Sequence, residues 1–508
     1  MMCSNYDKEK EPICALLSEK DEETIDFIKR AKVNVLLWAV LGSGVAGKEL
    51  LNVEKDSHRP WSKRGMSDSE FIDRVKKLGI EVFAVLWQSQ GYRFEKDMGA
   101  GKGLGSEMIE ESACRSLRGA KPKDIWLLPG FKGKFDIFYM CLNSEIWKAY
   151  LKEIIDFQMD SGVAGVQIDE SSNPFDGIIL GAGLCKNCLR GFEDREKLVE
   201  DAKKSGFFTF HIIQSRKKEI FKRYFEYLKG RSEENFRELA EYIKKKGGKV
   251  TGNFYSLLPN YWNLVKYVDF ISFELGFIPY KKGCCSKNHC YYRLGRALDR
   301  KKDIVMVPDI LTSMLLRDMR RETVIKILRV LIGEALANGG RFMVPYSCYT
   351  LLGKPFYPPI EPFEEYHKSA IENRKFFENM ESLAEVAIKI DRDKVEMNRF
   401  LFPYSWFFKT AKKLADMHIP YDFVFDDDER YRYVLSEEKK WIDGIEKLSV
   451  GKMSDKLYVS HYDTKAGEAM FVVNYDVEKK HEYRVKVNVR EEIKFDNDTC
   501  ALRVLVLG

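Results

Sequence analysis

Short apolar runs alternate with longer amphipathic stretches from residue 20 to about 350, which is typical of parallel strands joined by crossover helices. The pattern predicts strands at Val33–Val40, Glu81–Gln88, Phe135–Leu142, Val163–Asp169, Lys249–Tyr255, Val268–Glu274, Ile304–Asp309 and Arg341–Tyr346. A capping box of Ser67 and Glu70 starts one of the helices between them. Eight such units, with no Gly-x-Gly-x-x-Gly turn after the first strand, favour a (β/α)8 TIM barrel within residues 1–360.

The texture of the chain changes after Pro358 and Pro359. Residues 361–460 predict a small α/β domain, with an amphipathic helix followed by a strand, a helix and a second strand. Residues 461–508 alternate apolar and polar positions at period two, which predicts a C-terminal antiparallel β module. The expected fold class is therefore α/β, with a barrel followed by two smaller domains.

Composition narrows the functional class. Charged residues make up 32% of the chain, above the roughly 25% of an ordinary globular protein, which favours a soluble protein and is compatible with a thermophilic source. The net charge of +6 is spread over short basic runs, so we expect no nucleic-acid partner and no membrane binding. The start "MMCSNYDKEKEP" has no signal-peptide core, and the eleven cysteines favour thiols or metal ligands, so we expect a cytoplasmic protein.

Carboxylates stand where two of the predicted strands end. In "GVQIDE", Val166 and Ile168 suit the helix-facing side, so Asp169 points into the barrel at its carboxyl rim, where barrel enzymes place their chemistry. The same parity puts Glu274 at the end of another strand, while Glu170 begins a loop and is an alternate candidate. Asp309 ends a third strand. A lone strand-end carboxylate often only caps a helix or pairs with a cation, but several on one rim favour catalysis.

Polar and aromatic side chains that could bind a ligand also lie near the predicted strand ends. Amide, phenol and indole groups suit sugar hydroxyls and sugar faces, although aromatic side chains are also common core residues. The candidate substrate-binding residues are Trp38, Trp87, Trp126, Asn253, Tyr255 and Tyr346.

Two groups of cysteine and histidine follow predicted strands and could close one tetrahedral zinc site. The candidate ligands are Cys185, Cys188, Cys284, Cys285, His289 and Cys290. The alternative is a set of ordinary reduced thiols. A zinc with four protein ligands would be structural, and no cofactor is expected for catalysis.

The succession "KKLGIEVFAVLW", "CLNSEIWKAYLKEIIDFQMDSGVAGVQIDE", "CKNCLRGF", "TGNFYS", "VDFISFELG" and "LANGGRFMVPY" resembles the barrel of glycoside-hydrolase-like proteins, including hypothetical glycosyl hydrolases. The segment "LADMHIPYDFVFDDD" is similar to the flavodoxin-like trimerisation domain of family forty-two β-galactosidases. That resemblance implies a homo-oligomer, dimer or trimer, and a structural zinc held by a cysteine cluster.

The resemblance departs from the β-galactosidase pattern at the catalytic positions. Those enzymes end strand four in Asn-Glu and strand seven in Glu, whereas this chain has Asp169 and Glu170 on strand four and Asp309 on strand seven. Barrels that resemble the α-galactosidase group use a strand-four Asp nucleophile and a strand-six acid, which Asp169 and Glu274 fit better. The clan, and α or β specificity, stay open.

These observations together predict a glycosidase that acts on a carbohydrate substrate, with Asp169 as nucleophile and Glu274 as acid/base. Two other classes of protein are compatible with the same sequence. One is a non-catalytic carbohydrate-binding barrel, and the other is a structural assembly protein stapled by zinc.

Overall fold

The computed structural model describes most of the chain. The described residues are 12–17, 21–38, 66, 68–94, 106–116, 119–121, 135–169, 171–172, 183–205, 219–346, 356–395, 401–437, 443–452, 454–479, 484–485, 489–495 and 501–507. The candidates Trp126 and Glu170 lie outside them, and for Trp38 only the backbone is described.

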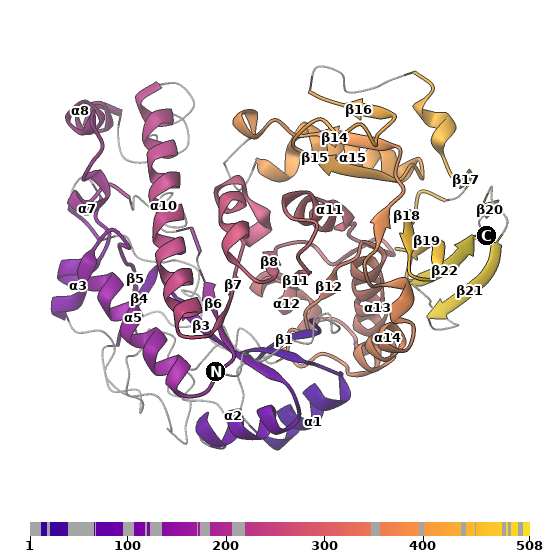
Figure 1. Ribbon diagram of the computed structural model, residues 1–508, viewed down its shortest axis with the longest axis horizontal. Helices are drawn as coiled ribbons and strands as arrows, with labels where there is room; N and C mark the ends of the chain where they lie inside the picture. Colours follow the sequence, from indigo (N-terminus) through magenta and orange to yellow (C-terminus); the bar gives the residue numbers. More distant parts are fainter. Residues whose placement is uncertain are drawn as a thin grey trace.

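Eight parallel strands lie at the centre of the molecule in two sheets, of order β1-β2-β3-β6-β7 and β12-β11-β8 (Figure 1). They are β1 (Cys14–Leu17), β2 (Val35–Trp38), β3 (Glu81–Trp87), β6 (Gly165–Asp169), β7 (Lys249–Gly252), β8 (Ile271–Leu275), β11 (Ile304–Pro308) and β12 (Arg341–Phe342). Parallel bridges from Asn253 to Ser272 and from Ala15 to Val344 join the sheet edges, so each strand has a parallel neighbour on both sides. This mixed α/β arrangement is consistent with a TIM-barrel fold.

Helices connect the central strands. They are α1 (Glu22–Arg30), α2 (Asp68–Lys77), α3 (Ser106–Ser112), α5 (Glu145–Asp160), α7 (Lys186–Leu189), α8 (Arg195–Ser205), α10 (Glu219–Lys245), η3 (Tyr255–Leu257), η4 (Pro259–Tyr267), α11 (His289–Leu298), α12 (Ile310–Arg317) and α13 (Arg321–Ala337). The first of them shows why such segments fold. Asp21 accepts a hydrogen bond from the Thr24 backbone amide at the N-cap of α1, and Ile25 and Ile28 bury the inner face.

Side chains of the central strands alternate between two apolar clusters. One small cluster lies among the strands and includes Cys14, Val35, Leu37, Phe83, Phe270, Val305, Val307 and Met343. The residues between them belong to a large cluster that also contains residues of the surrounding helices, and we call it the helix-facing cluster. Its strand residues include Leu36, Ala84, Val166 and Ile168. The parity inferred from "GVQIDE" is therefore the parity that the strand has.

The prediction of Phe135–Leu142 as a central strand is wrong. Strand β5 (Phe135–Tyr139) instead pairs antiparallel with β4 (Gln90–Phe94), in a two-stranded sheet apart from the central ones. The central strand that the pattern missed is β1, a four-residue run too short to show a period. Period-two alternation does not distinguish a strand of a peripheral hairpin from a central one.

Two further units follow the central strands. Helix α14 (Glu361–Glu372) precedes both of these units and packs on α13. Its His367 ring nitrogen Nδ1 lies 2.7 Å from the Ala31 carbonyl oxygen. Next comes a parallel sheet of order β15-β14-β16, covered by α15 (Figure 1, upper right). Its elements are β14 (Val386–Lys389), α15 (Trp406–Asp416), β15 (Tyr421–Val424) and β16 (Tyr433–Leu435).

The last sheet is antiparallel, with the order β13-β18-β19-β22-β21. Its strands are β13 (Glu381–Ser382), β18 (Leu457–Thr464), β19 (Gly467–Asn474), β21 (Val489–Phe495) and β22 (Leu502–Leu507). The short elements are β9 (Tyr280–Lys281), β10 (Cys284–Cys285), η6 (Arg374–Phe376), η7 (Arg392–Lys394), η8 (Phe402–Tyr404), η9 (Ile445–Leu448), β17 (Gly451–Lys452) and β20 (Arg484–Val485). Because β13 precedes β14 in the chain but pairs with β18, the last two units are interlocked.

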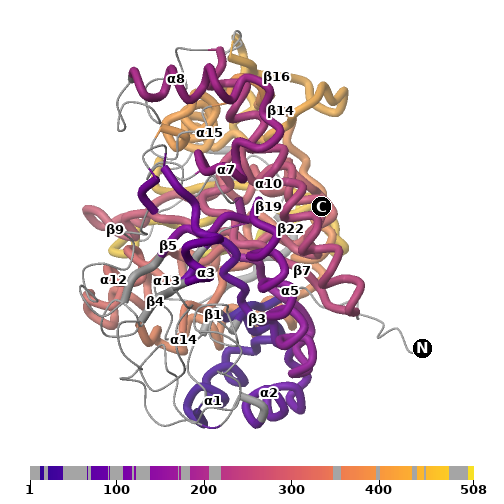
Figure 2. The backbone as a smooth tube through the Cα atoms, turned by 90° about the vertical axis from the view of Figure 1, so that its left-hand side faces the viewer, coloured from indigo at the N-terminus to yellow at the C-terminus, as the bar shows by residue number. Residues whose placement is uncertain are grey.

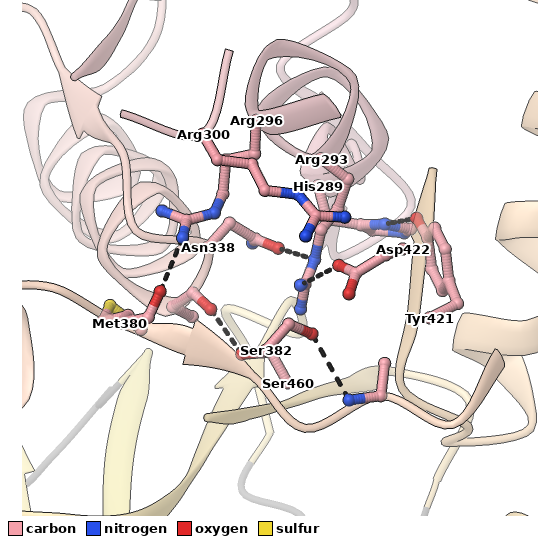
Figure 3. A network of polar contacts seen from close by, with 12 residues as sticks. His289, Arg293, Arg296, Arg300, Asn338, Met380, Ser382, Tyr421, Asp422 and Ser460 are labelled. Carbon is pink, nitrogen blue, oxygen red and sulfur yellow. Dashed lines mark hydrogen bonds and ion pairs between the residues drawn. The ribbon is translucent and has the colours of Figure 1, made fainter. Parts of the chain in front are cut away.

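A fully buried cation joins the central unit to both later sheets (Figure 3). The Arg293 guanidinium of α11 donates Nη1–H to Asp422 Oδ1 of β15 at 2.8 Å and Nε–H to Asn338 Oδ1 at 3.0 Å. The Tyr458 hydroxyl of β18 donates to the same Asn338 oxygen at 2.6 Å. A buried charge is tolerated only when it is paired and hydrogen-bonded, so this contact set fixes how the three units dock.

Glu334 of α13 lies near this junction and is fully buried. Its carboxylate accepts hydrogen bonds from the Asn288 backbone amide at 2.6 Å and from the Tyr475 hydroxyl. Burial raises the pKa of Glu334 to about 7 despite these donors.

None of the helices in the described ranges combines the length and the apolar character that a membrane-spanning helix requires.

The raised pKa of Glu334 makes folding pH-dependent. Its contribution to stability is fully present below the ordinary pKa of 4.5 and is lost as the pH rises through about 7, because the folded state holds the proton more tightly. We expect Glu334→Gln to gain stability relative to wild type over that interval. Urea unfolding at several pH values measures this, with exposed Glu446→Gln as the control. Parallel stability curves for wild type and Glu334→Gln would contradict it.

Candidate functional site

Polar side chains meet where three neighbouring central strands end. Asp169 is the last residue of β6, Asn253 directly follows β7, and Glu274 is the next-to-last residue of β8. The order β6-β7 and the bridge from Asn253 to Ser272 make these strands consecutive. Because the strands are parallel, their carboxyl ends lie on one side, and Figure 2 shows β9 and α12, which follow β8 and β11, on one side of the molecule.

Asn253 lies between the two carboxylates. Its side-chain nitrogen Nδ2 donates to Asp169 Oδ1 at 2.9 Å and to Glu274 Oε2 at 2.8 Å. The two carboxylate oxygens are therefore within about 6 Å of each other. All three residues are half-buried. We call Asp169, Asn253 and Glu274 the carboxylate row.

The layer below the row explains why the three side chains converge. Gln167 on β6 is in register with Thr251 on β7, and both are buried, as is Ser272 on β8. The Thr251 hydroxyl donates to the Phe270 carbonyl at 2.9 Å. Each row residue comes two positions after one of these, so it points to the same side of its strand.

Of the candidate tryptophans, Trp87 is the one whose side chain lies in the described part of the structure. Trp87 is the last residue of β3, is half-buried, and is in register with Asp169 on the adjacent strand. Parallel partners in register project to the same face, so Trp87 lies beside the row. The backbone of Trp38 pairs with that of Ala84 on β3.

A second polar group borders the row at Gly276, which follows Glu274 by two residues. A Cβ atom at Gly276 would lie 2.6 Å from Asp309 Oδ2 and 2.9 Å from the Tyr255 hydroxyl, so only glycine leaves room for both. Asp309 is buried and caps α12, because its Oδ1 accepts from the Thr312 amide at 2.8 Å. Sequence reasoning named Tyr255 and Asp309 but missed Gly276, whose only signal was its place at a strand end.

Tyr346, a substrate-binding candidate of the sequence, lies away from the carboxylate row, among apolar side chains. Tyr346 is buried in the helix-facing cluster, where its ring centroid is 4.3 Å from that of Phe27 on α1. Phe342 and Val344 belong to the same cluster, so the side-chain parity of this segment turns Tyr346 away from the strand interior.

Cys185 and Cys188 lie in a buried cluster with two other cysteines, Cys114 and Cys141. Cys141 Sγ is 3.5 Å from Cys185 Sγ and 3.4 Å from Cys188 Sγ, and the ligand atoms of Cys114, Cys141 and Cys188 lie within 4.8 Å of one another. Hydrogen bonds from Cys114, and then from Cys141 and Cys188, hold the pKa of Cys185 well below its usual range. Cys114, Cys141 and Cys188 therefore have a spacing that could hold a metal ion, and Cys185 lies beside them.

The expected partners of Cys185 and Cys188 are wrong, because Cys284, Cys285, His289 and Cys290 belong to a different neighbourhood. Cys284 bridges to Asp476, and the Cys285 amide donates to the Tyr475 carbonyl at 2.9 Å, which docks this hairpin on the C-terminal sheet. His289 Nδ1 is 2.7 Å from the Tyr421 hydroxyl. Among the described residues, the cluster of Cys114, Cys141 and Cys188 is the group with metal-ligand spacing.

No protein-family model matches the chain, and no curated protein matches it significantly. Two of the solved structures that match it align over nearly its full length with TM-scores above 0.5. The α-L-fucosidase isoenzyme 2 from Paenibacillus thiaminolyticus is 10% identical, with 98% of each chain covered and a TM-score of 0.58. The β-galactosidase from Bacillus circulans sp. alkalophilus is 11% identical, with 98% of this chain and 100% of that chain covered and a TM-score of 0.61. The chain therefore has a glycoside-hydrolase-like fold.

Proposed function

We propose that the eight central strands form a (β/α)8 barrel and that the protein is a glycoside hydrolase using Asp169 and Glu274. The observation that carries this proposal is the carboxylate row, in which Asn253 links the two carboxylates at the carboxyl ends of β6 and β8. The likeness to an α-L-fucosidase and a β-galactosidase supports a substrate with an O-glycosidic bond. Trp87 and Tyr255 are the candidate sugar contacts beside the row. Trp38 and Trp126 remain candidates on the basis of the sequence alone.

The spacing of the row supports a retaining mechanism. Carboxyl groups about 5–5.5 Å apart suit retention, and about 6.5–9.5 Å suits inversion. In this mechanism an oxygen of Asp169 attacks the anomeric carbon while Glu274 gives its proton to the leaving oxygen. Glu274 then takes a proton from water, whose oxygen displaces Asp169 from the sugar. Atoms and charge balance without a cofactor.

We expect Asp169→Asn and Glu274→Gln each to lower kcat by about 10²–10⁴-fold or more. A factor of this size is the usual contribution of a positioned proton-transfer group. The measurement is nitrophenol release from a panel of α- and β-linked nitrophenyl glycosides. Asp309→Asn is the matched control, since Asp309 caps α12, and Glu170→Gln tests the alternate nucleophile. A larger loss in Glu170→Gln than in Asp169→Asn would transfer the nucleophile role to Glu170.

The same panel separates the other two classes of protein. A wild-type chain that binds sugars without cleaving any glycoside would be a non-catalytic carbohydrate-binding barrel. A chain that neither binds nor cleaves them, yet loses its assembly with its metal, would be a zinc-stapled structural protein. Either result would overturn the proposed hydrolase.

We also propose that Cys114, Cys141, Cys185 and Cys188 hold one structural zinc ion. Tetrahedral zinc with Zn–S bonds of about 2.3 Å separates its sulfurs by about 3.8 Å, close to the 3.4 and 3.5 Å that separate Cys141 Sγ from the Cys188 and Cys185 sulfurs. The four thiols come from three separate segments, so a shared metal would tie α3, the end of β5 and α7 together. Four protein ligands leave no position for water, so this zinc would be structural.

Cys141→Ser should bind about one zinc equivalent less than wild type and should unfold at lower temperature, because one ligand of the four is lost. Metal analysis of protein prepared without chelator gives the first quantity, and thermal unfolding the second. The control is Cys285→Ser, which changes a buried thiol outside the cluster. Equal zinc content in wild type and Cys141→Ser, including none in both, would contradict the metal site.

The segment from about 380 to 460 is our proposed subunit contact, as the resemblance to a trimerisation domain implies. Its described part exposes Leu401 and Tyr404, with 41% and 68% of their surfaces accessible. We expect light scattering to give a dimer or trimer mass, and Tyr404→Glu to shift it toward the monomer of 59.2 kDa. A monomeric wild type at working concentrations would contradict this contact.

A further inference from the structure

We propose that Asn253 is a positioning residue that shares its amide nitrogen between Asp169 and Glu274 and holds them at the spacing of a retaining pair. This role replaces the sugar-hydroxyl contact that the sequence suggested for Asn253. The inference rests on the proposed function and adds a residue that acts through the two carboxylates.

The hydrogen-bond count supports this role. An asparagine side chain has two N–H donors, both on Nδ2. The contacts of 2.9 Å to Asp169 and 2.8 Å to Glu274 use both of them. A sugar hydroxyl could accept a hydrogen bond from Nδ2 only by displacing one carboxylate.

The orientation of the amide follows from its charge surroundings. The opposite orientation would turn the carbonyl oxygen toward two carboxylates, which offer no donor when ionised. In the present orientation Asn253 Oδ1 is buried and has no hydrogen-bond partner within the described part of the chain. The polar contacts of this side chain therefore run through its nitrogen, toward the two carboxylates.

The backbone of Asn253 is held from both neighbouring strands. Its amide donates to the Ile168 carbonyl at 3.0 Å, and its position bridges to Ser272. The Ser171 hydroxyl donates to the Ile168 carbonyl at 2.6 Å and reaches the Asn253 carbonyl at 3.3 Å. A side chain fixed at its root in this way can set the distance between two others.

The arrangement has a consequence for titration. A hydrogen bond donated to a carboxylate favours its ionised form, while a second carboxylate nearby favours the protonated form of one of the two. Loss of the shared amide therefore removes one hydrogen-bond donor from each carboxylate. Both carboxyl groups should then protonate at higher pH.

Asn253→Ala tests the positioning role. We expect kcat to fall about a hundredfold with KM changed by less than about threefold, and the acidic limb of the kcat/KM profile to move to higher pH. Asn253→Asp should move that limb further, because it adds a third carboxylate. The control is Asn373→Ala, which removes an amide that donates to the Ser369 carbonyl at 2.9 Å after α14. A raised KM with an unmoved acidic limb would identify Asn253 as a sugar contact and overturn the proposal.

A second measurement keeps this inference separate from the hydrolase proposal. Carbon-13 NMR of protein labelled at its Asp and Glu carboxyls gives the titration midpoints of Asp169 and Glu274 without any substrate. Higher midpoints in Asn253→Ala than in wild type support the shared amide even if no glycoside is cleaved. Unchanged midpoints overturn it, whether or not the enzyme is active.

Discussion

The parallel direction of the central strands is the constraint on which the candidate site depends. Each strand has a parallel neighbour on both sides, so the carboxyl ends of β6, β7 and β8 meet at one side. Residues at equivalent positions of such strands project to the same face. Asp169, Asn253 and Glu274 are far apart in sequence, yet strand direction and parity bring them into hydrogen-bond contact.

A different interaction holds the rest of the molecule to this centre. Arg293 is a fully buried cation. Its partners are Asn338 after α13, Asp422 on β15 and Tyr458 on β18. Removing the Asp422 carboxylate would leave the Arg293 charge without its counter-ion in a low-dielectric interior, which costs several kcal/mol. The later sheets are therefore docked by a polar contact set that tolerates little variation, whereas apolar packing alone would accept several geometries.

The cysteine cluster joins three segments that follow one another in the chain. Cys114 follows α3, Cys141 follows β5, Cys185 caps α7 and Cys188 lies within it, so one buried centre gathers all three segments. An antiparallel bridge between Ala113 and Met140 already pairs the first two, and the cysteines add α7 to them.

The sequence by itself determined the α/β alternation, seven of the eight central strands and the inward parity of Asp169 and Glu274, because these follow from local periodicity. Only the tertiary structure decided that β5 leaves the centre, that Cys141 rather than Cys284 joins Cys188, and that Tyr346 faces α1. Those outcomes depend on which segments pack together. Alternation along one strand carries no information about its partner, and a cysteine's spacing reveals only the ligands that are close in sequence.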